Sequence, residues 1–176
     1  MQQFSLCLDK IKKDCLKFIK SQETQADKFK NKERMIKSFL IPLCFWISKK
    51  AEKKRPYFIG LAGGQGTGKT TVSSLIKIIL IKHFKLKVFR ISIDDFYKTR
   101  KDRINLSKKV HPMLLTRGVP GTHDINMMLN FFKKSKIKKF KRLKLPTFNK
   151  AIDDGFNKKK RYDLKNKADV IIFEGW

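Results

Sequence analysis

Three short segments of the chain carry the residues whose types and spacing could do chemistry. They read "GGQGTGKT" at residues 63–70, "ISIDDFYKT" at 91–99 and "ADVIIFEGW" at 168–176. The first places a lysine and a threonine after a run of glycines, the second holds two neighbouring carboxylates, and the third ends an apolar run with a glutamate. Cations and a metal that hold phosphates, with a carboxylate that accepts a proton, are what phosphoryl transfer to an alcohol requires.

The glycine-rich segment fits the pattern G-x-x-x-x-G-K-[ST], with the apolar run "YFIGLA" before it and "TTVSSLIKIIL" after it. A strand before this pattern and a helix after it indicate phosphate binding, because loop N–H groups and the helix N-terminus then face an anion. Lys69 is expected to reach the β- and γ-phosphates of a nucleotide, and Thr70 to bind Mg²⁺. A purely structural glycine turn would need neither residue. The predicted nucleotide-binding residues are Gly63, Gly64, Gln65, Gly66, Thr67, Gly68, Lys69, Thr70 and Thr71.

The carboxylates of the other two segments stand where apolar strands run out. Glu174 follows "VIIF" and is a candidate for the second, acidic residue on the magnesium side of a P-loop protein. Asp94 and Asp95 end the strand "LKVFRISI", at the edge of the sheet where open α/β folds bind ligands. One of them could accept the proton of an attacking hydroxyl. The alternative for Asp95 is a structural role as a helix cap or turn former.

The elements that must position these residues follow from hydrophobic periodicity. A strand at 57–62, a helix from 70 to 84 and a strand at 86–93 form a βαβ unit, which predicts a parallel sheet. The last strand is expected at 169–173. Between these elements we expect a short helix at 103–109, a strand within "KRLKLPTF", and a helix that Thr122 or Asp124 caps and that runs to Lys134.

The first 55 residues are predicted to be helical. Apolar residues at helical spacing indicate one amphipathic helix at 4–19, and a second helical stretch is expected at 26–54, kinked or divided by Pro42. A basic amphipathic helix could lie on a membrane, but packing on the following domain is favoured. We therefore predict two parts, a helical segment at 1–55 packed on the core and a P-loop core at 56–176.

Composition limits the partners and the compartment. The 176 residues have a formal net charge of +28, carried by 35 lysines and 8 arginines. Nucleic-acid recognition favours arginine, so we interpret the lysine excess as a solvated surface and expect no dedicated nucleic-acid partner. Cys7, Cys15 and Cys44 have no metal-binding spacing and suggest no disulfide framework. Because no signal peptide or membrane span is recognised, we expect a cytoplasmic protein.

The motifs, taken in order, resemble a known group of enzymes. "GLAGGQGTGKTT", "ISIDDFYKT" and "VIIFEGW" are similar to the P-loop kinases that include uridine kinase, phosphoribulokinase and pantothenate kinase. "RGVPGTHD" at 117–124 and "LPTFNKAIDDG" at 145–155 resemble, more narrowly, the D-glycerate 3-kinases of plant type and their fungal relatives. The resemblance runs from about residue 40 to Trp176. It implies an α/β fold with a P-loop NTPase core, a parallel sheet and flanking helices.

The resemblance also implies an activity and a set of roles. The activity is ATP-dependent phosphorylation of a small hydroxylated molecule with Mg²⁺, and D-glycerate to 3-phosphoglycerate is the favoured reaction. Asp94 aligns with the acid that activates the acceptor hydroxyl, and Glu174 with the acid on the magnesium side. The residues implied to line the acceptor pocket are Tyr97, Lys98, Arg117, His123 and Asp124.

Several of these roles have structural alternatives. Arg117 could pair with the carboxylate of glycerate through a bidentate guanidinium, or could be a surface arginine. His123 could bond the acceptor or satisfy a turn. Asp153 and Asp154 could touch the acceptor or cap a turn before Gly155.

The resembled enzymes continue beyond their "FEGW". We therefore expect the chain to lack a C-terminal part with further strands, an arginine-bearing lid and the loop that holds adenine. The uncovered sheet edge predicts a marginal monomer, self-association or a truncated gene product. Two alternatives to a working kinase remain open at this point, a nucleic-acid-associated P-loop ATP-binding protein and a non-catalytic kinase remnant.

Overall fold

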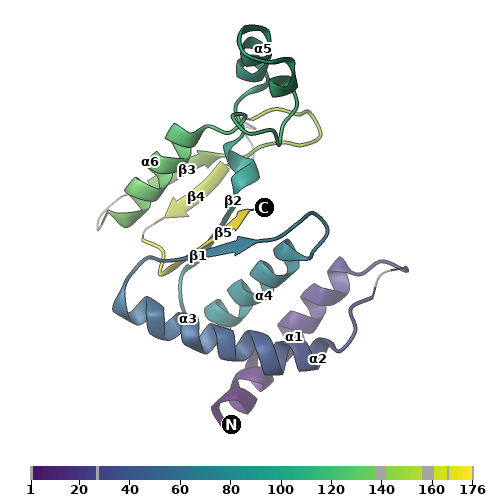
Figure 1. Ribbon diagram of the computed structural model, residues 1–176. Coiled ribbons are helices and arrows are strands. Elements are labelled where there is room, and N and C mark those ends of the chain that lie inside the picture. The colour runs from purple at the N-terminus through teal and green to yellow at the C-terminus, as the bar shows by residue number, and fades with distance from the viewer. Residues whose placement is uncertain (1, 27, 138–141, 156–160, 166, 176) are drawn as a thin grey trace. The chain divides into compact units, whose positions relative to one another are not determined.

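The structure is a computed structural model of the α/β class that describes residues 2–26, 28–137, 142–155, 161–165 and 167–175 (Figure 1). The chain folds into two compact units. The first comprises the residues up to Arg90 together with 168–174, and the second comprises 91–167 with Gly175. The predicted division at residue 55 stays a prediction.

The main sheet has three parallel strands in the order β1-β5-β2, which confirms the expected parallel sheet. The strands are β1 (Tyr57–Ala62), β5 (Val170–Gly175) and β2 (Val88–Ser92). The strand that comes last in sequence is therefore central in the sheet. Val170, Ile171 and Ile172 are fully buried, as a central parallel strand requires.

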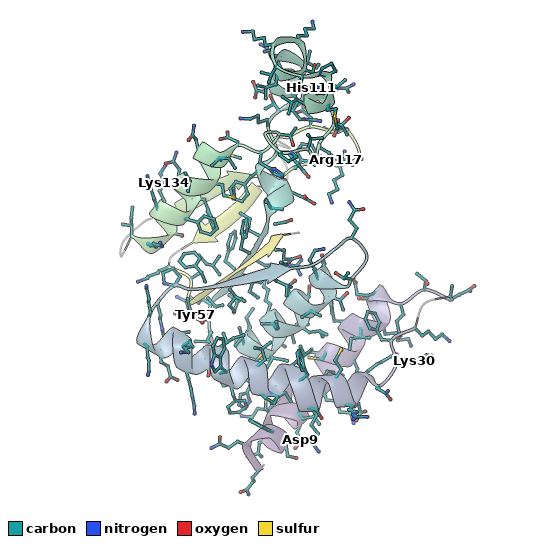
Figure 2. All side chains as sticks on the ribbon, in the orientation of Figure 1. Asp9, Lys30, Tyr57, His111, Arg117 and Lys134 are labelled. Carbon is teal, nitrogen blue, oxygen red and sulfur yellow. The ribbon has the colours of Figure 1, made fainter. Side chains whose placement is uncertain are left out.

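A layer of helices packs on this sheet in the first unit. Helices α1, α3 and α4 contact one another, and α3 and α4 contact β1 (Figure 1). Their bounds are α1 (Gln2–Gln22), α3 (Ile41–Lys53) and α4 (Lys69–Lys82). Apolar side chains fill the space between them (Figure 2). The largest contributors include Ile11, Ile19, Leu40, Ile47, Leu75, Ile76 and Ile79. The strand β1 and the helix α4, which follows the glycine-rich loop, thus share one hydrophobic core.

The second predicted helical stretch begins later than expected. Residues 28–31 are not helical, and Asn31 has a left-handed backbone with φ of 51°. The helical run then contains α2 (Lys32–Met35), a π-helical turn η1 (Ile36–Leu40) and α3. Pro42 is the second residue of α3 and lies two positions after the π-helical turn ends at Leu40. A local π adjustment relieves the missing N–H and the ring clash, so the proline divides the run without ending it.

The second unit holds shorter elements. The predicted helix near 103–109 begins earlier, and the predicted strand at 141–148 is confirmed for its central residues. Their bounds, in chain order, are η2 (Ile93–Phe96), α5 (Arg100–Lys109), η3 (Pro112–Leu115), α6 (Ile125–Lys136), β3 (Arg142–Pro146) and β4 (Arg161–Lys165). β3 and β4 pair antiparallel, with Leu143 opposite Leu164. The strand β4 was not predicted, because "RYDLK" has only two apolar residues among charges.

A search of the described residues for long apolar helices finds none that meets the requirements of a membrane span.

Candidate active site

The glycine-rich loop connects β1 to α4 and has the backbone that its glycines permit. Gly66 and Gly68 have φ angles of 75° and 77°, in the left-handed region that other residues rarely adopt. Gly68 is also the N-cap of α4 and provides no side-chain cap. The first N–H groups of a helix have no partner within it, so an anion placed here would meet donors and the positive end of the helix dipole.

Lys69 reaches back over this loop. Its ammonium donates to the backbone carbonyls of Gly63 and Gly64, and the Thr67 hydroxyl also donates to Gly64, with an O to O distance of 2.9 Å. The residues from Gly64 to Thr67 are exposed to solvent. The structure therefore places a lysine cation at the mouth of an open loop of glycines.

Glu174 lies at the end of β5 against the first turns of α4, and its side chain is buried. The Thr70 hydroxyl donates to Oε2 at 3.2 Å, and the Ser73 hydroxyl donates to Oε1 at 2.7 Å. Arg90 Nε lies 3.1 Å from the same Oε1. Residues 104 positions apart in sequence, Thr70 and Glu174, are thus brought into contact.

The pairing of Thr70 with Glu174 fits a magnesium ion. Two neighbouring ligands of an octahedral Mg²⁺ at about 2.05 Å lie about 2.9 Å apart, close to the 3.2 Å between these oxygens. Among the described residues no group of three or more acidic, histidine or cysteine side chains forms a metal cage. Magnesium needs no such cage where one or two protein oxygens act together with nucleotide phosphates.

The two aspartates after β2 have different roles in the structure. Asp95 Oδ2 accepts from the backbone N–H of Ser92 at 2.9 Å, and Ser92 Oγ accepts from the N–H of Asp94 at 3.2 Å. This is a capping box that starts η2, which gives Asp95 the structural role considered for it. The Asp94 side chain instead forms an ion pair with Lys150, at 2.7 Å between Nζ and Oδ2.

Tyr97 and His123 stack in the second unit, with ring centroids 4.3 Å apart, and Phe148 packs edge-on against Tyr97. The stretch after Tyr97 pairs with the segment before α6, because the Lys98 N–H donates to the Thr122 carbonyl at 2.9 Å. Burial lowers the pKa of His123, and the nearby charge of Asp94 opposes this shift without reversing it. The imidazole is therefore neutral at neutral pH.

Arg117 is engaged by the protein's own carboxylate. Its guanidinium donates to Asp153 Oδ1 at 2.7 Å and to the backbone carbonyl of Lys150. The fully buried Arg103 pairs with the other oxygen of Asp153 at 3.0 Å. Burial works to raise the pKa of Asp153, but the bonds from Arg117 and Arg103 outweigh it and the pKa is lowered. Arg117 thus pairs with a carboxylate of the chain's own 149–155 loop, and its role toward an acceptor stays a prediction.

Two further acids act as local caps. Asp124 is the N-cap of α6, and its Oδ1 accepts from the Met127 N–H at 2.9 Å. Asp154 Oδ1 accepts from the N–H groups of Arg100 and Gly155 at 2.8 and 2.7 Å. Both hydrogen-bonding patterns are explained by the backbone they satisfy.

Sequence reasoning missed Arg90, Ser73 and Lys150, which contact predicted site residues. Ser73 lies three positions after Thr70 and so shares its helix face, which is a signal the sequence did carry. Arg90 is a cation inside the apolar strand β2, an unusual placement that could have been noticed. Nothing local in the sequence pairs Lys150 with Asp94.

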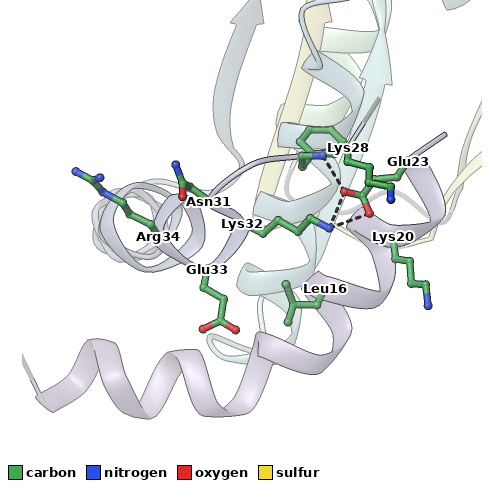
Figure 3. A pocket seen from close by; sticks show the side chains of 9 residues that line it. Leu16, Lys20, Glu23, Lys28, Asn31, Lys32, Glu33 and Arg34 are labelled. Atoms are coloured by element: carbon green, nitrogen blue, oxygen red, sulfur yellow. Dashed lines mark hydrogen bonds and ion pairs between the residues drawn. The ribbon is translucent and has the colours of Figure 1, made fainter. Parts of the chain in front are cut away.

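A separate depression of about 810 Å³ lies between the end of α1 and the start of α2 (Figure 3). Lysines 20, 28 and 32 line it, and Glu23 accepts from Lys32 and from the Phe29 N–H. None of the predicted site residues is among its lining residues. Its charged groups are explained by the pairing that ties the segment before α2 to α1.

Comparison with known proteins identifies relatives of this arrangement. No family model matches the sequence. An uncharacterized kinase of Schizosaccharomyces pombe is 32% identical over 132 residues, which cover 69% of this chain and 46% of that protein. The chloroplastic D-glycerate 3-kinase of Arabidopsis thaliana is 33% identical over 129 residues, which cover 69% of this chain and 28% of that enzyme.

Solved structures give the same result. The D-glycerate 3-kinase from Cryptococcus neoformans var. grubii matches with a TM-score of 0.67 at 28% identity, over 79% of this chain and 52% of that one. The chain spans less than half the length of the two curated relatives named above.

Proposed function

Because the homologues and structural neighbours of this chain are P-loop kinases, we propose that it transfers the γ-phosphoryl group of ATP to a hydroxyl of a small molecule. The observation that carries the proposal is the contact of Thr70 with Glu174 beside the glycine-rich loop and Lys69. Lys69 and Thr70 come from α4 and Glu174 from β5, two elements far apart in sequence, and all three lie in the first unit. These are the groups that a magnesium nucleotide needs.

The first unit supports the nucleotide side of this reaction. The loop at 63–68 and the N-terminus of α4 offer N–H groups to the phosphates, and Lys69 adds a cation for the β- and γ-phosphates. Thr70 and Glu174 would hold the magnesium ion, which neutralises the phosphate oxygens when bound. Together these residues would make the γ-phosphorus more electrophilic and would stabilise the negative charge on the leaving oxygen of ADP.

The second unit supports the acceptor side. We propose that Asp94 accepts the proton of the acceptor hydroxyl as its oxygen bonds to the γ-phosphorus, while the bond from that phosphorus to the β–γ bridging oxygen breaks. The products are the phosphorylated acceptor and ADP. Lys150 contacts Oδ2 of Asp94, and among the described residues no donor contacts Oδ1. Oδ1 is therefore the oxygen that could accept the proton. Tyr97, Lys98, Arg117, His123 and Asp124 remain the proposed surroundings of the acceptor.

D-Glycerate is the acceptor we favour. The reasons are the glycerate kinases among the relatives and the cationic side chains of Arg117 and Lys150 in the second unit, which suit an acceptor with a carboxylate. The loop at 149–155 carries Lys150 and binds Arg117 through Asp153, so it would set the positions of both cations.

Calorimetric titration with ATP and Mg²⁺ tests nucleotide binding. Lys69→Ala is expected to weaken nucleotide binding at least about 100-fold. The reason is that a charge-assisted hydrogen bond from a lysine to a phosphate contributes about 3 kcal/mol. Lys82→Ala is the matched control, since Lys82 ends the same helix and its ion pair with Asp14 is exposed. It should bind as the unaltered chain does. Equal binding by the Lys69 variant contradicts the proposal.

Release of ADP with D-glycerate, pantothenate or uridine as acceptor then tests the transfer itself. Release that requires D-glycerate supports the favoured acceptor, and release with another acceptor corrects the acceptor alone. Nucleotide binding without transfer to any of them favours a non-catalytic remnant. Salt-dependent binding to unrelated oligonucleotides with no nucleotide effect would instead favour the nucleic-acid alternative.

A further inference from the structure

Arg90 joins three parts of the first unit through one guanidinium. From β2 its Nε reaches Glu174 Oε1 at 3.1 Å, and its Nη1 donates to the Thr70 carbonyl at 3.1 Å. The same Nη1 donates to the hydroxyls of Ser73 and Ser74. The arginine is 29% exposed and the glutamate side chain 9%. Arg90 thus ties the end of β5 to the first turns of α4.

The two oxygens of the Glu174 carboxylate have separate partners. Oε1 receives Arg90 and the Ser73 hydroxyl, whereas among the described residues only the Thr70 hydroxyl donates to Oε2. Two donors on one oxygen prevent the carboxylate from rotating. The second oxygen therefore stays beside the Thr70 hydroxyl, in the arrangement that a pair of neighbouring metal ligands needs.

The charges of this cluster point in the same direction. A buried carboxylate is stable as an anion only beside a cation, and Arg90 is that cation. The positive charge of Arg90 offsets the negative charge of Glu174, so a free divalent cation meets no net negative charge at this pair. A magnesium ion that arrives on a nucleotide brings the negative charge of the phosphates with it.

We propose that Arg90 is a positioning residue that orients Glu174 for magnesium, and that the site takes Mg²⁺ only together with nucleotide phosphates. This inference rests on the proposed function, since it concerns the same nucleotide site. Its measurable consequence is coupling, the factor by which Mg²⁺ strengthens nucleotide binding. Residues that orient metal ligands typically change metal affinity by about 10- to 100-fold when they are replaced.

The experiment measures the dissociation constant of ADP by calorimetry, in EDTA and in excess Mg²⁺, and the heat of Mg²⁺ added without nucleotide. The unaltered chain is expected to bind ADP more tightly with Mg²⁺ and to show no saturable binding of Mg²⁺ alone. Arg90→Gln should reduce the coupling by about 10-fold or more. Its affinity for ADP in EDTA should stay within about threefold, because the described contacts of Arg90 are with Glu174 and α4 and include none of the loop residues 63–68.

Two further variants separate orientation from stability. Arg55→Gln is the matched control, because Arg55 pairs with Asp169 at 2.9 Å at the other end of β5. It removes an arginine–carboxylate pair at the residue that precedes the same strand and should leave the coupling unchanged. Arg90→Lys keeps the charge without the planar fork, so an intermediate coupling is expected and a folded variant is available if Arg90→Gln unfolds. On a Glu174→Gln background, Arg90→Gln should cause no further loss.

The outcomes are distinct. Unchanged coupling in the Arg90 variants, equal loss in the Arg55 variant, or saturable Mg²⁺ binding without nucleotide overturns this inference and leaves the proposed function standing. No nucleotide binding by the unaltered chain overturns both.

Discussion

The Asp94 carboxylate is engaged in the structure, because Lys150 Nζ lies 2.7 Å from its Oδ2. The Lys150 side chain is 62% exposed, and an ion pair with so exposed a partner contributes less than about 1 kcal/mol. The lysine can therefore leave or share the carboxylate at little cost. The Asp94 side chain itself is 25% exposed, so the fold leaves part of the carboxylate open to solvent. At the scale of single residues, the proposed base therefore remains accessible to an acceptor hydroxyl.

Replacement of Asp94 by Asn should lower the rate of ADP release with acceptor by about 10²- to 10⁴-fold, because the amide cannot accept the proton. Nucleotide affinity should change little, since Asp94 lies outside the glycine-rich loop in sequence and in unit. Single-turnover kinetics with calorimetry measures both quantities.

Lys150→Met is the control for this prediction. It breaks the same ion pair but leaves the carboxylate, so the rate at saturating acceptor should change by less than about fivefold, although loss of this cation weakens acceptor binding. Equal rates for the Asn variant and the unaltered chain would remove Asp94 from the mechanism.

At the scale of elements, α1, α3 and α4 are held together around three thiols. Cys7 and Cys15 on α1 and Cys44 on α3 are fully buried in the shared core. Burial raises the pKa of Cys7 to about 11 and that of Cys15 to about 12, and it raises the pKa of Cys44 further. The thiols are therefore protonated and unreactive while the helices stay packed.

The free energy of unfolding should fall as the pH rises above about 9, the ordinary pKa of the thiol. Folding raises the thiol pKa, so the stabilisation is complete below pH 9 and is lost as the unfolded chain ionises first. The loss amounts to about 1.4 kcal/mol per pH unit for each such thiol. Urea unfolding of the chain and of Cys44→Ala between pH 8 and 10 measures it.

The comparison between the two chains removes the contribution of the lysines, which both share. The Cys44→Ala variant should show a shallower decline with pH, and a disulfide-exchange reagent should react with the native thiols only as fast as the core opens. A decline of equal slope, or rapid labelling of the folded protein, would contradict the packing described.

At the scale of the whole molecule, the dominant property is the charge of +28 on 176 residues. Lysine side chains such as Lys30 and Lys134 lie on the outside (Figure 2). So many like charges repel one another in a compact chain and lower its stability, while they keep it dispersed in solution. The chain also spans less than half the length of the two curated relatives compared above, so its activity as a kinase is a proposal for experiment.

The melting temperature should rise with ionic strength from low salt to about 0.5 M sodium chloride, because screening shortens the range of this repulsion. A series in an uncharged osmolyte of matched osmolality separates screening from preferential exclusion. Differential scanning fluorimetry measures the change. A melting temperature that falls over the same range would mean that attractive ion pairs, such as Arg90 with Glu174, outweigh the general repulsion.

Local pattern was sufficient for much of the fold. The glycine-rich loop, its flanking strand and helix, and the apolar strand before Glu174 are each specified by neighbours a few residues apart, and the structure has them where the sequence predicted. β4 escaped prediction because its alternation rests on only two apolar residues, and the start of α2 was predicted too early because the left-handed backbone of Asn31 has no signal in the apolar pattern.

The sequence by itself thus determined which residue types the chain offers for phosphate and metal, because a P-loop is encoded in one contiguous stretch. Only the tertiary structure decided their partners. Thr70 pairs with Glu174 across 104 positions, Arg117 with Asp153 across 36, and Lys150 with Asp94 across 56. Hydrophobic periodicity indicates which face of a helix or strand is buried. A side-chain pair, however, depends on how elements distant in sequence are placed in space, and a local sequence pattern does not encode that placement.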